Sequence, residues 1–250
     1  GGLHQQMEHF GEARELYEQG RALFTRLGDV SGTASALNAI GVLALQMTSY
    51  HEAVELFRQC AELCRRIRNK RGEGMALSNL GRALLGLDRP GEALDASRLG
   101  LNIFTELKDL PAESFVLESM CWALERVGQS EEALQMLQRR LRIEELRGDQ
   151  DRTVASTLKA RGELLQRMGR FEEALASFDR CLKMYEGLED TLGMVAALKG
   201  RGAVLEVMGS VEAAATAYEE ALRLSPDDEE VRRSLERLSP SEDPQSPSAA

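Results

Sequence analysis

The sequence lacks an apolar run long enough to cross a membrane. A spanning helix needs about 18 or more predominantly apolar residues, whereas the strongest stretch here, Ile40–Leu45, is far shorter. The opening residues, GGLHQQMEHF, also lack the apolar centre of a secretory signal peptide. These two absences predict a cytoplasmic protein.

Positive charge is scarce relative to negative charge. The chain carries 31 Lys and Arg against 41 Asp and Glu, a formal net charge of −10 at pH 7. Nucleic-acid binders usually show a basic footprint, and anionic lipid attracts basic segments. We therefore expect neither nucleic acid nor a membrane as a partner. With 43% apolar and 29% charged residues, the chain still has the composition of an ordinary folded protein.

Cysteine and histidine are few and do not form a metal-binding pattern. Cys60 and Cys64 lie one helical turn apart and could in principle share an ion. However, Cys60 and Cys181 occupy one slot of the repeat described below, and Cys121 fills a glycine slot, so these thiols read as small packing residues. The histidines have no partner at ligand spacing: His4, His9 and His51. We expect no metal, no cofactor and, in a reducing compartment, no disulfide.

Catalytic motifs are missing as well. The segment Gly200–Leu205, GRGAVL, is similar to a dinucleotide-binding loop, but it lacks the third glycine and no strand precedes it. Neighbouring glutamates such as Glu131 and Glu132 fall where helices should begin, and there they favour the helix dipole. The sequence shows no P-loop, nucleophilic serine motif or pair of catalytic acids, so we expect a protein that is not an enzyme.

What the sequence does contain is one pattern repeated at steps of 40 or 41 residues. Internal repeats of this length predict a solenoid or a related array. The alanine slot is filled by Ala13, Ala53, Ala93, Ala133, Ala174 and Ala214. Four residues after it, the aromatic slot holds Tyr17, Phe57, Ser97, Leu137, Phe178 and Tyr218.

Three further series keep the same register. The glycine slot, twelve residues before the alanine slot, holds Gly41, Gly81, Cys121, Gly162 and Gly202. Four residues before the glycine slot stand Leu37, Leu77, Leu117, Leu158 and Leu198. Sixteen residues after the alanine slot stand Asp29, Asn69, Asp109, Asp149 and Asp190. Five series in one register are very unlikely by chance, so the repeat is a property of the fold.

Each repeat predicts two helices, which we call its first and second helix. Apolar residues recur at helical spacing in both, and small residues at the alanine and glycine slots let the two axes approach closely. Ser49 and Glu52 have the spacing of a capping box at the start of a second helix. Pro90 and Pro111 fall near helix starts, where a missing N–H costs little. Glycines should follow the ends of first helices as C′ residues: Gly128, Gly169 and Gly209.

This pattern resembles the tetratricopeptide repeat, W-x2-L-G-x2-Y followed by A-x3-F and P. Leucine fills the tryptophan slot throughout, Arg161 and Arg201 depart from the leucine slot, and only Pro226 matches the proline slot. The period is similar to that of the long-helix variety in Pins-type adaptors and kinesin light chains. The resemblance implies an all-α, right-handed superhelical solenoid of antiparallel helix pairs. Its first helices would line a concave groove that binds partner peptides or helices.

The register divides the chain into segments. Residues 1–30 should be a partial first repeat, mainly its second helix, with Leu3–His9 as a fragment of a first helix. We infer from this that the natural protein extends further upstream. Five repeats follow at 31–70, 71–110, 111–150, 151–191 and 192–226. Residues 227–238 read as a polar capping helix that closes the last repeat, and the Ser- and Pro-rich residues 239–250 should be disordered.

Register also predicts the exposed groove positions: three residues before, one after, and four and five after the glycine slot. They are Asn38, Val42, Leu45 and Gln46; Ser78, Arg82, Leu85 and Gly86; Glu118, Trp122, Glu125 and Arg126; Lys159, Glu163, Gln166 and Arg167; Lys199, Ala203, Glu206 and Val207. Asn79 matches the slot at which Pins-type units hold a peptide backbone, with Asn38 one residue off. The clamp of chaperone-binding members is not reproduced, because Glu163 follows Lys159 where asparagine would be required.

We predict a protein-interaction module, a scaffold or adaptor, that binds a partner peptide or helix in this groove. Trp122, the only tryptophan, and Phe115 would be apolar anchors, with burial between repeats as the alternative for Trp122. The cations expected to meet partner carboxylates are Arg82, Arg126, Lys159 and Lys199, with a solvated face as the alternative for the lysines, and Arg167 is a further partner-binding candidate of the groove. Asn38 and Asn79 would contact the partner backbone.

Two other functions stay open: a sensor arm of a larger signalling protein, and a self-associating scaffold. We expect a monomer, with a homodimer as the alternative.

Overall fold

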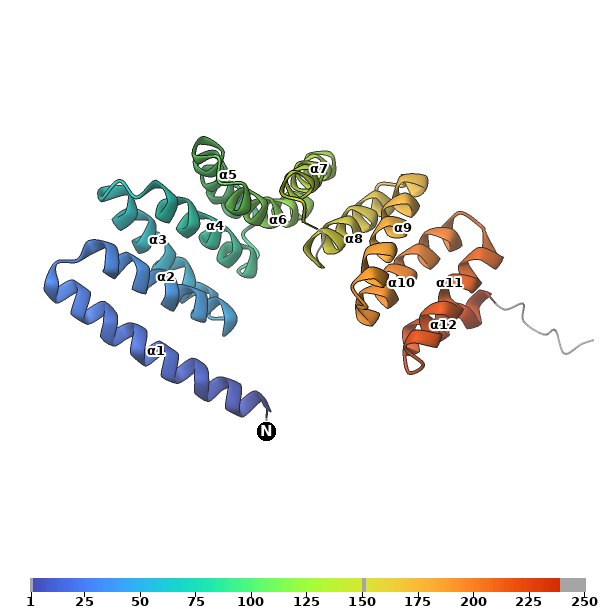
Figure 1. The fold of residues 1–250 in the computed structure, drawn as a ribbon, viewed down its shortest axis with the longest axis horizontal. Helices are drawn as coiled ribbons and strands as arrows, with labels where there is room; N and C mark the ends of the chain where they lie inside the picture. The colour runs from blue at the N-terminus through green and yellow to red at the C-terminus, as the bar shows by residue number, and fades with distance from the viewer. Residues whose placement is uncertain (1, 150–151, 239–250) are drawn as a thin grey trace, which may run out of the picture. The chain divides into compact units, whose positions relative to one another are not determined.

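The structure is a computed structural model that describes residues 2–149 and 152–238, with side chains from residue 10 onward. These residues form helices and no strand, so the predicted all-α class is confirmed (Figure 1). The helices are α1 Gly2–Leu27, α2 Val30–Gln46, α3 Tyr50–Arg66, α4 Lys70–Gly86, α5 Pro90–Leu107, α6 Leu110–Arg126, α7 Ser130–Arg147, α8 Arg152–Arg167, α9 Phe171–Gly187, α10 Thr191–Val207, α11 Val211–Leu224 and α12 Glu229–Leu238. The tail predicted to be disordered, residues 239–250, lies outside the described residues.

The chain divides into two compact units, Gly1–Ile143 (unit 1) and Glu144–Ala250 (unit 2), and α7 crosses the boundary. In unit 1, each helix from α1 to α6 packs against the next one along the chain. The first helices α2, α4 and α6 also touch one another in sequence, as α8 and α10 do in unit 2. Each unit therefore has a layer of first helices backed by a layer of second helices, which is the arrangement predicted from the repeat.

Small residues at the glycine slot set the distance between the two helices of a pair. A Cβ added to Gly41 would lie 2.7 Å from the ring of Phe57, and Phe57 is fully buried. Burying such a side chain stabilises the fold by about 1.5–3 kcal/mol. In the next repeat the aromatic is replaced by Ser97, whose Oγ would lie 2.3 Å from a Cβ on Gly81. The α4–α5 pair is thus held by small residues on both helices.

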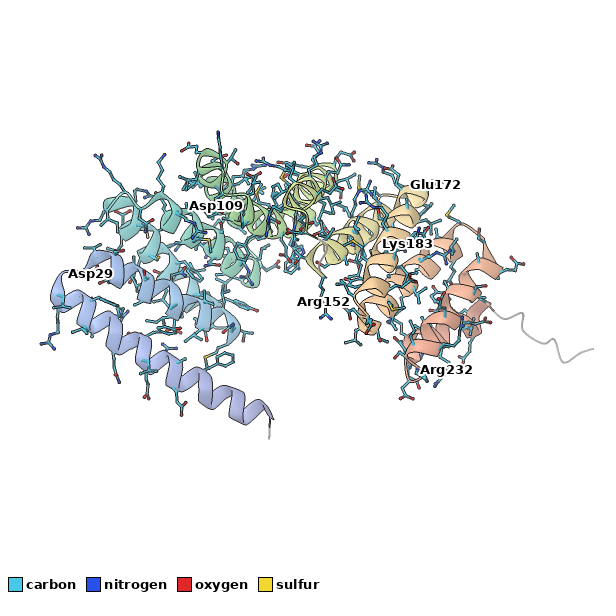
Figure 2. The ribbon with its side chains drawn as sticks, in the orientation of Figure 1. Asp29, Asp109, Arg152, Glu172, Lys183 and Arg232 are labelled. Carbon is cyan, nitrogen blue, oxygen red and sulfur yellow. The ribbon has the colours of Figure 1, made fainter. Side chains whose placement is uncertain are left out.

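Four of the five Asp and Asn residues of the last series are N-caps of first helices. In four cases the side-chain oxygen accepts a hydrogen bond from the backbone N–H three residues later, as N-caps do. The pairs are Asp29–Gly32 at 2.9 Å, Asn69–Gly72 at 2.9 Å, Asp109–Ala112 at 3.2 Å and Asp190–Gly193 at 3.1 Å. Figure 2 labels Asp29 and Asp109 at their turns. These caps fix where each first helix begins, which keeps the repeats in register.

The second helices start differently, and here one prediction is wrong. Ser49 precedes α3, but its side chain makes no capping hydrogen bond, so the capping box with Glu52 is absent. The other terminal signals are confirmed. Pro90 and Pro111 lie in the first turns of α5 and α6. The predicted C′ glycines have left-handed φ angles of 79° at Gly128, 74° at Gly169 and 74° at Gly209.

The helices at the two ends of the structure, α1 and α12, differ from the helices of the internal repeats. Leu3–His9 continue α1 without a break, so they are not a fragment of a first helix as predicted. At the other end, α12 packs against α11 and buries Val231 in the core of unit 2. No helix among the described residues combines the length and the apolar character that a bilayer crossing requires.

Candidate functional site

Unit 1 contains an open pocket of about 560 Å³ on its first-helix layer, which we call the layer pocket. Its lining residues are Val42, Leu45, Gln46, Tyr50, Arg82, Leu85, Gly86, Trp122, Glu125 and Arg126. All but Tyr50 belong to α2, α4 and α6 and occupy the three register positions that follow the glycine slot. The structure therefore brings together these predicted groove positions of three consecutive repeats, because α2, α4 and α6 lie side by side.

Trp122 is the largest side chain of the layer pocket. It is 58% exposed, so the alternative of burial between repeats does not apply. On the opposite side of the pocket, Tyr50 packs on α4 at Gly86, where an added Cβ would lie 2.4 Å from the tyrosine ring. Val42, Leu45 and Leu85 supply aliphatic surface between the two rings. An exposed tryptophan on an apolar floor is the kind of surface on which binding energy concentrates.

Arg82 and Phe115, both predicted site residues, contact each other. The guanidinium carbon of Arg82 lies 5.3 Å from the centroid of the Phe115 ring, within the range of a cation–π interaction. Phe115 is half-buried on α6 and does not line the layer pocket. Its role in the structure is to support Arg82, so the prediction of a direct apolar anchor fits Trp122 better than Phe115.

The two asparagines are bonded to each other. The Nδ2 of Asn79 donates a hydrogen bond to the Oδ1 of Asn38 at 3.2 Å. Asn79 is buried, because α4 packs closely on α2, and it is not positioned to contact a partner backbone as predicted. Asn38 is half-buried and stays a candidate. The geometry makes Asn79 a support for Asn38.

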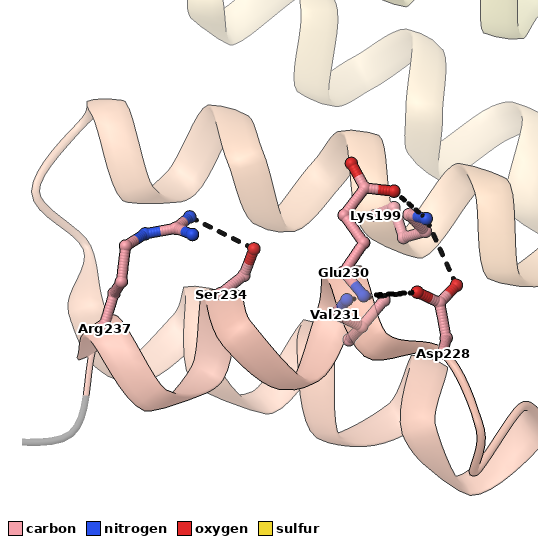
Figure 3. A network of polar contacts seen from close by, with 6 residues as sticks. All are labelled: Lys199, Asp228, Glu230, Val231, Ser234 and Arg237. Carbon is pink, nitrogen blue, oxygen red and sulfur yellow. Dashed lines mark hydrogen bonds and ion pairs between the residues drawn. The ribbon is translucent and has the colours of Figure 1, made fainter.

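In unit 2 the predicted lysines already have anionic partners. Lys159 pairs with Glu163 one turn along α8, with 2.8 Å between Nζ and Oε1. Lys199 on α10 pairs with Glu230 and, at 3.1 Å, with Asp228 at the start of α12 (Figure 3). Burial alone would lower the pKa of Lys199, but the hydrogen bonds to Glu230 and Asp228 outweigh it and raise that pKa. Both lysines therefore have a carboxylate of this chain within reach, and Lys199 attaches α12; their contact with a partner carboxylate stays a prediction.

Glu206, a predicted groove position on α10, is engaged in the same way. It accepts a hydrogen bond from the Tyr218 hydroxyl at 3.0 Å and pairs with Arg237 of α12 at 3.4 Å. Burial and the hydrogen bond to Glu206 raise the pKa of Tyr218 to about 12. Arg167, the remaining predicted cation of unit 2, is exposed at the end of α8.

The two arginines that depart from the repeat pattern tie helices together. Arg161 on α8 donates to the Ser177 hydroxyl of α9 at 2.6 Å, and its burial lowers its pKa. Arg201 on α10 reaches Asp179 of α9, with 2.9 Å between the nitrogen and the carboxylate oxygen. Sequence reasoning left their direction open, because register gives a position on a helix and not the rotamer of a long side chain.

The cysteines pack in the core as the repeat slots predicted. All four are buried, and the thiols of Cys60 and Cys121 donate to the carbonyls of Ala34 and Ala133. Burial raises the pKa of Cys60, Cys121 and Cys181 to about 12 in each case. Thiols that stay protonated at neutral pH are poor nucleophiles. Among the described residues, no three His, Cys, Asp or Glu side chains gather at metal-binding distance.

Comparison with known proteins agrees with this repeat architecture. The tetratricopeptide repeat family model matches residues 1–66, 32–106, 123–187 and 153–227. The search of curated proteins gave no match. Among solved structures, the chain is similar to BtubC (BKLC) from P. vanneervenii, with a TM-score of 0.76 and 17% identity over 100% of this chain and 98% of that chain.

Two further structures share the fold at low identity. One is a Signal Transduction ATPase with Numerous Domains from Pyrococcus horikoshii that has a tetratricopeptide repeat sensor, with a TM-score of 0.70 and 17% identity over 92% of this chain and 36% of that chain. The other is YrrB, a tetratricopeptide repeat protein with an unusual peptide-binding site, with a TM-score of 0.59 and 17% identity over 81% of this chain and 92% of that chain. The family model, the helix pairs and the 40-residue register together show that the chain belongs to the tetratricopeptide repeat family.

Proposed function

We propose that this chain is a protein-interaction module that binds a peptide segment of a partner protein in the layer pocket of unit 1. The observation that carries the proposal is the pocket itself, built from equivalent positions of three first helices around the exposed Trp122. The lining residues of the pocket include no nucleophile beside a base, so we infer binding without catalysis. Binding without catalysis is the role of a scaffold or adaptor. YrrB, which has the same fold, is a peptide-binding protein by its description.

The contacts of the layer pocket support a peptide as the occupant. A small rigid ligand needs an enclosing cavity, whereas this pocket is open along the first-helix layer and offers separate aliphatic, aromatic and charged areas. An extended peptide places successive side chains about 3.3 Å apart on alternating sides. Such a ligand can meet several of these areas at once.

The test is a selection from a random peptide library displayed on phage, followed by binding measurements with two variants. Trp122→Ala removes the exposed ring of the pocket, and Leu99→Ala removes another exposed apolar side chain of unit 1 that does not line the pocket. We expect selected peptides to lose about tenfold or more in affinity for Trp122→Ala, as hot-spot residues do, and to bind Leu99→Ala like the original protein. Failure to select any peptide, or equal binding to all three proteins, would refute the proposal.

A second function, self-association, is favoured by the outer side of α1. Leu16, Leu23 and Leu27 are 67%, 53% and 71% exposed and lie on one side of the helix. Leu56, the residue of α3 equivalent to Leu16, is buried in the core. Light scattering over a range of concentrations separates this function from a monomeric receptor. If a dimer forms through α1, Leu23→Glu will dissociate it, and Leu99→Glu will not.

A further inference from the structure

The cations predicted to meet partner carboxylates differ in whether this chain already neutralises them. Arg126 pairs with Asp88 at 2.6 Å. In unit 2, Lys159 and Lys199 pair with carboxylates of α8 and of the α12 start. Arg82 is different, because among the described residues its guanidinium contacts the Phe115 ring and pairs with no carboxylate.

The contact with Phe115 leaves Arg82 ready to bind an anion. A guanidinium is planar, and its five N–H donors point outward in that plane. The contact with the ring uses no carboxylate, so the donors that do not face the ring stay available to an anion. The ring also restricts the long side chain, so less rotamer freedom is lost when an anion binds. Arg82 is exposed and lines the layer pocket between Val42 of α2 and Trp122 of α6, at the equivalent register position.

Resting on the proposed function, we propose that the layer pocket selects an acidic-hydrophobic peptide segment: an aliphatic or aromatic side chain next to an Asp or Glu. The apolar side chain lies on Val42, Leu45 and Leu85 beside Trp122. The neighbouring carboxylate accepts hydrogen bonds from the edge of the Arg82 guanidinium, where the planar fork can hold both oxygens. Arg82 is therefore the specificity-determining residue of the pocket, since Arg126 already has a carboxylate partner in Asp88.

Because the protein as a whole is negatively charged, a preference for acidic peptides would identify a local cation as its cause. With a net charge of −10, the chain as a whole repels acidic peptides. A preference for Glu over Gln in a bound peptide must then come from a local cation. It cannot come from the general field of the protein.

The experiment uses a membrane-bound array of decapeptides, each with a Leu-Phe pair flanked by Glu, by Gln or by Lys at every neighbouring position. The best binders are titrated in solution while the emission of Trp122, the single tryptophan, reports occupancy of the pocket. The protein is compared with Arg82→Gln and, as the matched control, with Arg98→Gln, which removes an arginine of unit 1 that does not line the layer pocket. Far-UV circular dichroism verifies that all three have the same helix content.

We expect Glu-flanked peptides to bind the unaltered protein and Arg98→Gln roughly fivefold to tenfold more tightly than Gln-flanked ones, as a charge-assisted hydrogen bond predicts. Arg82→Gln should bind the Glu and Gln series within about twofold of each other, since a neutral amide lacks the charge. Peptides that bind without a preference for Glu, or a preference that survives Arg82→Gln, would overturn the assignment of Arg82 and leave the proposed function standing, provided that Trp122→Ala still lowers binding to the array by about tenfold or more. Absence of any Trp122 response to any array peptide would overturn both.

Discussion

Four residues after the glycine slot, α2 and α4 of unit 1 carry leucine, whereas α8 and α10 of unit 2 carry polar residues. These are Leu45 and Leu85 in unit 1, and Gln166 and Glu206 in unit 2. In unit 1 the leucines form the floor of the layer pocket, while in unit 2 Glu206 is engaged by Tyr218 and Arg237. The same scaffold position thus serves an open surface in one unit and an internal contact in the other.

The cations follow the same division. In unit 2, Lys199 of α10 pairs with Asp228 and Arg237 of α12 pairs with Glu206, so α12 takes up groove positions of α10. In unit 1 the Arg82 guanidinium contacts the Phe115 ring and pairs with no carboxylate among the described residues. The comparison teaches that register alone does not identify binding residues, because a groove position binds a partner only when the chain has not already used it.

The largest expected effect tests whether one unit can be destabilised without affecting the other. Phe178 is fully buried against Gly162 in unit 2, and Phe178→Ala should lower the free energy of unfolding by about 3–5 kcal/mol. Because Trp122 reports on unit 1 alone, its emission below the unfolding temperature should stay unchanged, and so should peptide affinity. Phe57→Ala is the matched variant in unit 1 and should alter both. Equal loss of peptide binding in the two variants would show that binding is not confined to unit 1.

The next effect concerns the pocket floor. Leu85→Glu places a charge on the apolar surface, which must be desolvated when a peptide binds, so affinity for selected peptides should fall roughly tenfold or more. Gln166→Glu makes the equivalent change in unit 2 and should leave affinity unchanged. Fluorescence titration of Trp122 measures both. A similar loss for Gln166→Glu would mean that the polar first-helix layer of unit 2 also binds the peptide.

Much of the scaffold could be predicted from the sequence, because it depends on slots that repeat. The glycine and aromatic slots gave the helix pairs, and the prolines and C′ glycines gave helix ends, since backbone rules act over a few residues. The Asp and Asn series was visible as a register, but its capping role was not recognised, and Ser49 suggested a cap that α3 does not use.

The site was less predictable, because it depends on which side chains meet. Register placed Trp122 and Arg82 on the first-helix layer, where the structure has them. It could not show that Asn79 turns inward to Asn38, or that Phe115 supports Arg82. It also could not show that α12 brings Asp228 to Lys199, because that pairing joins residues far apart in the register.

A smaller effect tests whether the two units share one scaffold. Asp29 caps α2 in unit 1 and Asp190 caps α10 in unit 2, with side-chain hydrogen bonds of 2.9 and 3.1 Å. Replacing either by Ala should lower the free energy of unfolding by about 1 kcal/mol, as loss of an N-cap usually does. Ser49→Ala, which removes no capping bond, should have almost no effect. Urea denaturation followed by circular dichroism gives the three values, and a loss near zero at either Asp29 or Asp190 would contradict a common scaffold.

The smallest effect tests, through its pH dependence, how α12 is held on α10 in unit 2. Lys199→Met removes the ion pairs with Asp228 and Glu230 and should cost about 0.5 kcal/mol at pH 7, since the pairs are partly exposed. Burial would raise the pKa of Asp228, but backbone N–H groups and Lys199 lower it instead. Lys159→Met is the matched control, because its partner Glu163 lies on the same helix.

The sign of the pH dependence follows from those two pKa shifts. A carboxylate with a lowered pKa stabilises the fold fully above its ordinary value of about 4, and the stabilisation is lost as the pH falls through the lowered value. The raised pKa of Lys199 means that its contribution is lost only as the pH rises above about 10.5. The difference in stability between the protein and Lys199→Met should therefore be constant from about pH 5 to 9 and disappear near pH 2. Hydrogen exchange of the α12 amides at these pH values measures it, and a difference that persists at pH 2 would show that Lys199 holds α12 by packing of its aliphatic chain rather than by charge.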